Sequence, residues 1–202
     1  MKLTTRELSI LAVFGAVWGL VEISLGSVLK SLNVPLSGMI LSALGLTVAL
    51  IGRVYVPRKG STLFIGVIAM LLKLFSMGGI IIGPMIAIFT EALVAELVLS
   101  LFGKPSRAAF SLAGALGVTW TLLQPFVTGP LLFGRSMLVV WLDFIDNGVR
   151  LLGFEPQAVV GIVLVMLAIY LVVGALVGWI SWSLARQLAQ RAGKTGFPVV
   201  RG

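Results

Sequence analysis

The sequence predicts an all-α integral membrane protein with six transmembrane helices. Only 11% of its 202 residues are charged and 59% are hydrophobic, whereas about 25% of the residues in a soluble domain are charged. The hydrophobic residues form long runs, and a run of about 20 can cross a bilayer as a helix. Glycine and proline separate these runs. The length fits one compact bundle, so we expect residues 1–202 to form a single transmembrane domain.

Six apolar segments are the expected helices. The first follows Lys2 and Arg6 and is longer than the roughly 7–15 apolar residues of a signal peptide, so we expect it to be retained. The third is short, because Gly78-Gly79 breaks it before Ile80–Ile82, a candidate for a loop that dips back into the bundle. The expected helices cover residues 8–29, 36–55, 62–77, 84–102, 108–132 and 158–188.

The longest connection, residues 133–156, predicts an additional helix between the fifth and sixth spans. Apolar and charged residues alternate in it at mixed spacing, which is typical of a helix that lies on the membrane surface or caps the bundle. Asp143 and Asp146 are three residues apart and would meet on such a helix. A solvated face is the more common explanation for such a pair.

The basic residues predict that both ends of the chain lie in the cytoplasm, at the plasma membrane. With the N-terminus inside, the inner segments hold eleven Lys and Arg residues, and the outer segments hold three: Lys30, Arg135 and Arg150. Lys and Arg are concentrated in cytoplasmic loops. An odd number of helices would place the basic C-terminal tail outside, against the same rule. The +8 net charge is therefore explained by topology, and we expect no nucleic-acid partner.

Small residues form a stripe on the first helix. Ala12, Gly15, Ala16 and Gly19 share one face, and small residues let membrane helices approach closely. The stripe either packs within the bundle or docks on a partner subunit. A similar pair in the last helix, Gly174-Gly178, is expected to pack within the bundle.

Four ionisable residues interrupt the apolar runs: Glu22, Lys73, Glu91 and Glu96. Each costs roughly 2.5–3.5 kcal/mol at the middle of a helix, so each is expected to be paired or functional. Lys73 and Glu91 lie at similar depths on sequential antiparallel helices, and we expect them to pair. The pair would be either a structural ion pair or part of a polar cavity open to the outside. We expect Glu96 to contact the inner loops or a partner.

The candidate substrate site lies in the outer half of the bundle. Trp120 and Gln124 reach a depth similar to that of the three outer charges. Because the chain has no Cys and no His, thiol nucleophiles, Ser-His-Asp triads and zinc sites with His or Cys ligands are excluded. We expect no catalytic residues, no metal and no cofactor. The candidate substrate-binding residues are Glu22, Lys73, Glu91, Trp120, Gln124 and Trp141.

Two segments, together with the layout of six helices in about 200 residues, resemble a known family. Leu11–Trp18 looks like the helix with which the S components of energy-coupling factor (ECF) vitamin transporters dock on their coupling subunit, with Ala12 and Ala16 at the docking positions. Gly83–Glu96 is similar to the stretch that opens the fourth helix of several S components. The cobalt and nickel members typically begin with a His-containing motif, so the absence of His excludes those metals.

The resemblance implies a division of labour between subunits. The S component would capture a small water-soluble vitamin or precursor, while a coupling subunit and two ATPases drive import. Carboxylates suit a cationic ligand and tryptophans stack on rings or cations, so a thiamine-like or pyrimidine-like substrate is expected unless Lys73 simply neutralises Glu91. Two other readings remain open: a stand-alone channel or proton-coupled carrier that uses the buried charges as a relay, and a structural subunit of a membrane complex.

Overall fold

The computed structural model describes residues 3–76, 82–103, 105–155 and 157–194. All regular structure in these ranges is helical. The elements are α1 (Thr5–Ser31), α2 (Ser37–Tyr55), α3 (Ser61–Leu72), the 3₁₀ turn η1 (Lys73–Phe75), α4 (Ile82–Phe102), α5 (Arg107–Phe133), α6 (Met137–Leu152) and α7 (Val159–Lys194).

Five of these helices are long and apolar enough to cross a membrane, which identifies a multi-pass membrane protein. They are α1, α2, α4, α5 and α7 up to Leu188. The segment expected to be the third span is a shorter apolar helix, Ser61–Phe75. The predicted break at Gly78-Gly79 lies outside the described residues, and so does most of the candidate re-entrant run.

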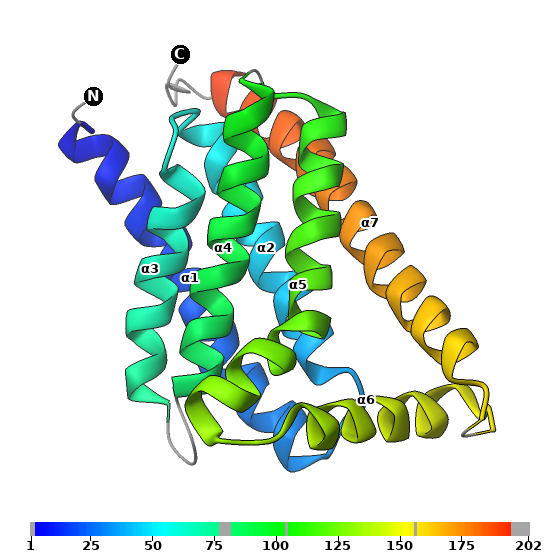
Figure 1. The fold of residues 1–202 in the computed structure, drawn as a ribbon. Helices are drawn as coiled ribbons and strands as arrows, with labels where there is room; N and C mark the ends of the chain where they lie inside the picture. Colours follow the sequence, from blue (N-terminus) through cyan, green and yellow to red (C-terminus); the bar gives the residue numbers. More distant parts are fainter. Residues whose placement is uncertain (1–2, 77–81, 104, 156, 195–202) are drawn as a thin grey trace.

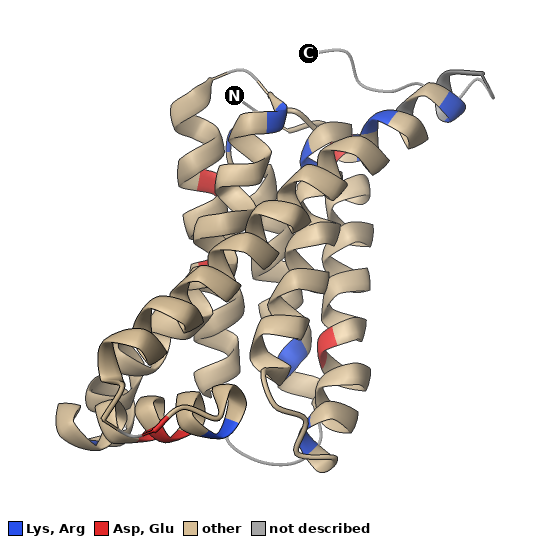
Figure 2. Cartoon of the chain, turned by 90° about the vertical axis from the view of Figure 1, so that its right-hand side faces the viewer, with Lys and Arg blue, Asp and Glu red and all other residues tan. Residues whose placement is uncertain are grey.

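The helix predicted between the fifth and sixth spans is confirmed as α6. The Ser136 side chain caps its N-terminus by accepting a hydrogen bond from the Val139 N–H. It ends at Gly153, whose φ of 68° lies in the left-handed region that favours glycine. The helix lies across the end of the bundle that is opposite both chain termini, as Figure 1 shows. In Figure 2, both acidic and basic residues lie on or beside this helix, and basic residues are also frequent at the other end of the bundle.

Glycines bring α5 and α7 into backbone contact near the end of the bundle that holds the termini. A Cβ on Gly114 would overlap the carbonyl oxygen of Gly174, and a Cβ on Gly178 would overlap the carbonyl oxygen of Phe110. This agrees with the prediction that Gly174 and Gly178 pack within the bundle. Beyond this crossing α7 diverges from α5 toward α6 (Figure 1).

The far part of α5 turns toward the start of α4. Two prolines, Pro125 and Pro130, lie inside this helix, and proline removes a backbone hydrogen bond and bends a helix. Gln124 Nε2 donates to the carbonyl oxygen of Gly83 at 3.1 Å, and the ring of Phe133 also lies near Gly83. Because α5 turns one way and α7 the other, space is left between them above α6.

Near the start of α1 and the end of α7, Glu96 connects its own helix α4 with α2 and with the start of α3. Its carboxylate accepts hydrogen bonds from the backbone N–H groups of Gly60 at 2.7 Å and Thr62 at 3.0 Å. It also forms an ion pair with Arg53 Nη1 at 3.3 Å and accepts from Ser100 Oγ at 2.7 Å. The expected contact of Glu96 with a loop is therefore confirmed, and the loop is the one between α2 and α3.

Candidate functional site

A partly open cavity of about 820 Å³ lies at the α6 end of the bundle. Its lining comes from four parts of the chain: the connection from α1 to α2, the middle of α5, the α6 region, and α7. The lining residues are Leu29, Lys30, Asn33, Val34, Pro35, Leu36, Ser37, Gly38, Thr121, Leu122, Pro125, Phe126, Arg135, Val140, Asp143, Phe144, Asn147, Arg150, Leu151, Met166 and Tyr170. The divergence of α5 and α7 makes room for it.

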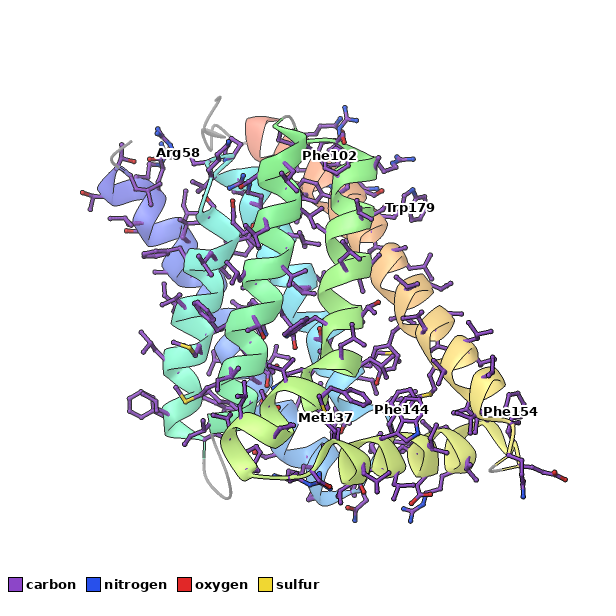
Figure 3. All side chains as sticks on the ribbon, in the orientation of Figure 1. Arg58, Phe102, Met137, Phe144, Phe154 and Trp179 are labelled. Atoms are coloured by element: carbon purple, nitrogen blue, oxygen red, sulfur yellow. The ribbon has the colours of Figure 1, made fainter. Side chains whose placement is uncertain are left out.

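The inner part of the cavity is apolar. Leu122, Val140 and Met166 are buried there. Phe126 and Phe144 add aromatic surface, with ring centroids 5.8 Å apart. Figure 3 shows Phe144 pointing from α6 into the space between α5 and α7. This part of the lining suits an apolar body such as a ring.

The mouth of the cavity is polar and mostly basic. Lys30, Arg135 and Arg150 are exposed and line it, together with Asn33 and Asn147. Asp143 is the one acidic residue of the lining, and it forms an ion pair with Arg135. Within the described ranges, no ion pair is formed by Lys30 or Arg150. The mouth therefore has an excess of positive charge.

The expected pair of Lys73 with Glu91 is wrong, because Lys73 pairs with Glu22. Lys73 Nζ lies 3.3 Å from Glu22 Oε2 and donates to the Glu22 carbonyl oxygen at 2.7 Å. Lys73 begins the 3₁₀ turn at the end of α3, and α3 packs along α1. Gly26 leaves room for the ammonium group, since a Cβ there would lie 3.3 Å from Nζ.

Among the described residues, Glu91 instead has no cation as an ion-pair partner. It is 3% exposed, and its Oε2 has no hydrogen-bond partner in the part of the chain that the structure describes. The Ser42 hydroxyl oxygen beside it also has no hydrogen-bond partner among the described residues. A buried carboxyl without a partner is unusual, because an unmade hydrogen bond to a buried polar group costs free energy.

None of the six predicted substrate residues lines the cavity. Trp120 Nε1 donates to Thr90 Oγ1 at 2.6 Å, so Trp120, like Gln124, ties α5 to α4. Trp141 stacks on Phe144, with centroids 5.8 Å apart, and thus supports the cavity wall. Glu22, Lys73 and Glu91 form a separate buried cluster. Sequence reasoning missed the connection from α1 to α2, and it used Lys30 and Arg150 only as topology signals.

The predicted docking stripe on α1 is divided between the inside and the surface. A Cβ on Gly15 would lie 2.6 Å from Cβ of Ile68, and one on Gly19 would lie 2.7 Å from Cδ1 of Leu72. Gly15 and Gly19 therefore pack against α3, so for these two residues the alternative of packing within the bundle holds, and not docking on a partner. Ala12 and Ala16 are half-buried.

Replacing Lys73 by methionine is expected to destabilise the fold strongly. Lys73→Met leaves the Glu22 carboxylate buried without its cation, and breaking a buried ion pair from one side typically costs about 3–5 kcal/mol. Thermal unfolding in detergent would show a clear loss of stability. Lys30→Met is the control, because Lys30 is exposed and its replacement should change stability by no more than about 0.5 kcal/mol. Equal melting temperatures for the two variants would contradict this role.

Chemically, the cavity can hold a small molecule by an apolar inner part and a basic mouth. Among the described residues, no group of three or more His, Cys, Asp or Glu side chains is placed to hold a metal ion. The chain was compared with protein-family models, with curated proteins and with solved structures, and none of them matches it.

Proposed function

We propose that this protein is the substrate-capture subunit of an ECF-type importer in the plasma membrane. The observation that carries the proposal is the cavity at the end of the bundle opposite both termini. Its volume of about 820 Å³ is within the range of about 300–1,000 Å³ typical of small-molecule sites. A small water-soluble vitamin or vitamin precursor would fit.

The proposed topology has six spans with both termini in the cytoplasm. The start of α1 and the end of α7 lie at the same end of the bundle (Figure 1), as an even number of crossings requires. In addition to the five long helices, the third span would be α3 with its 3₁₀ turn, Ser61–Phe75, whose 15 residues are short for a full crossing. The excess of Lys and Arg on the side of the termini favours the cytoplasm for that side. The cavity would then open to the outside, where a nutrient is captured.

The proposed partners are a membrane-embedded coupling subunit and two ATPases. The surface proposed for docking the coupling subunit is centred on Ala12 and Ala16 of α1, four residues apart on one face. Val13 and Val17 beside them are exposed apolar side chains. Small residues flanked by larger apolar ones suit close packing of a second membrane helix.

A second candidate function is a proton-coupled carrier that works without ATPases. The observation that favours it is the buried Glu91, which has no hydrogen-bond partner for Oε2 among the residues described and lies near the Glu22–Lys73 pair. Intramembrane carboxyl groups often mark proton relays. In this case Glu91→Gln would abolish transport by the protein alone in liposomes.

Native mass spectrometry of the gently purified protein from its own host tests the capture function. We expect a bound molecule of vitamin size and co-purifying ATPases. Retention of the fold with no bound molecule and no partner, together with uptake by the protein alone, would favour the carrier instead.

Bulk on the small face of α1 that Ala12 and Ala16 form is expected to abolish docking. Ala16→Leu or Ala12→Leu fills the space that a partner helix would need, so co-purification with the coupling subunit should be lost while the isolated protein stays folded and keeps its ligand. Val160→Leu is the control, because Val160 is exposed on α7, away from this face. Complex formation that is unchanged in both alanine variants would exclude this docking surface.

A further inference from the structure

The charges around the cavity indicate which class of molecule it takes. We propose that the cavity binds a small organic anion with a flat ring, whose negative charge lies at Lys30 and Arg150 and whose ring packs against Phe126 and Phe144. This inference rests on the proposed capture function and adds the substrate class.

The first argument is the convergence of the basic residues. Lys30 is in the last turn of α1, Arg150 is in the last turn of α6, and Arg135 precedes α6. These three are the only basic residues of the predicted outer segments, and all three line the cavity. Basic residues in the last turn of a helix interact favourably with the helix dipole. That interaction does not explain why Lys30, Arg150 and Arg135 come together at one opening.

The second argument is the charge balance. The ion pair with Asp143 compensates Arg135, and no other acidic residue belongs to the lining. Lys30 and Arg150 therefore leave two positive charges that the lining itself does not neutralise. A cleft lined by one sign of charge concentrates ligands of the opposite sign. The planar guanidinium of an arginine can also bind a carboxylate or phosphate by two parallel hydrogen bonds.

The third argument is the shape of the apolar part. Phe126, Phe144 and Trp141 form one aromatic cluster on α5 and α6, with centroid distances of 5.8–6.3 Å. Two of these rings line the cavity, and aromatic faces favour stacked or tilted contacts with another ring. The Tyr170 side chain, which is 7% exposed, completes the lining on the α7 side. A cationic, thiamine-like ligand is less well matched, because Glu22 and Glu91 do not reach this lining.

Three probes with the same ring and different charge test the proposal. Nicotinate is an anion, nicotinamide is neutral and 1-methylnicotinamide is a cation. Binding to the full chain in lipid nanodiscs would be measured by calorimetry. We expect nicotinate to bind at least about tenfold more tightly than the other two, and Lys30→Gln and Arg150→Gln each to weaken it about tenfold, as loss of a charge-assisted hydrogen bond does. Lys59→Gln is the matched control, since Lys59 is exposed in the loop between α2 and α3.

A second measurement uses the protein's own ligand. The molecule released by denaturing protein purified from its host would be identified by mass spectrometry, and we expect it to contain a carboxylate or phosphate and a ring. A neutral or cationic molecule, or nicotinate binding equal in wild type and both cavity variants, would overturn the inference while the capture function stands. If no molecule is released and no probe binds, the capture function itself fails, and the inference fails with it.

Discussion

Glu96→Ala is expected to lower the free energy of unfolding by about 3–5 kcal/mol, as the removal of one partner of a buried ion pair typically does. Arg53 and Glu96 are each 6% exposed, so water cannot replace the lost carboxylate around the guanidinium. The variant also leaves two backbone donors without their acceptor, the N–H groups of Gly60 and Thr62. These groups belong to the start of α3, where no carbonyl of the same helix is in reach.

Thermal or denaturant unfolding in detergent micelles measures this effect, and two variants separate its causes. Glu155→Ala makes the same change at an exposed position and should leave stability nearly unchanged. The double variant Arg53→Met/Glu96→Leu removes both charges, so it should be more stable than Glu96→Ala alone, because no uncompensated charge stays buried. If the double variant were the less stable of the two, desolvation of Arg53 would not be the main cost.

Most of the helices could be predicted from the sequence, because five of the apolar runs are long enough to cross a bilayer. The first helix nevertheless begins at Thr5, three residues before the expected start. A capping box explains the difference, since the Thr4 hydroxyl accepts from the Glu7 N–H and the Glu7 carboxylate accepts from the Thr4 N–H. This Thr-x-x-Glu pattern is a readable sequence signal for a helix start.

The partner of Lys73 could not be predicted, because pairing depends both on the depth of a residue along its helix axis and on the rotation of the helix about that axis. A rise of about 1.5 Å per residue puts Lys73 at a depth from which Glu22 and Glu91 are both reachable. Rotation about the axis decides between them, and that rotation depends on how Gly15 and Gly19 fit against α3. Packing of this kind is a tertiary property that the local sequence does not contain.

The cavity was missed for a similar reason. Its lining comes from four separate segments between residues 29 and 170, and none of them has a motif that indicates a binding site. One sequence signal could have indicated the cavity. The predicted outer segments hold three basic residues, although the positive-inside rule expects few there. Lys30, Arg135 and Arg150 are far apart in the sequence, so their convergence at one opening becomes visible only in the fold.

Gly178→Ala is expected to destabilise the protein by about 3 kcal/mol, the upper end of the usual cost of overpacking. A Cβ at this position would overlap the carbonyl oxygen of Phe110 and would lie 2.6 Å from Cα of Ser111. Both are backbone atoms of α5, so no side chain can turn away and the helices must separate. The better helix propensity of alanine, worth about 1 kcal/mol over glycine, is too small to compensate.

Gly161→Ala on the same helix is the matched control for this prediction. The nearest atom to its added Cβ would be Cε2 of Phe154 at 3.6 Å, an ordinary contact, so this variant should be neutral or more stable by up to about 1 kcal/mol. Unfolding of the two variants in the same detergent gives the comparison, and equal stability would show that the crossing of α5 and α7 is not tightly packed. Because α5 and α7 both line the cavity beyond this crossing, Gly178→Ala should also weaken ligand retention, whereas Gly161→Ala should preserve it. The glycine contact therefore links the stability of the bundle to the shape of the cavity.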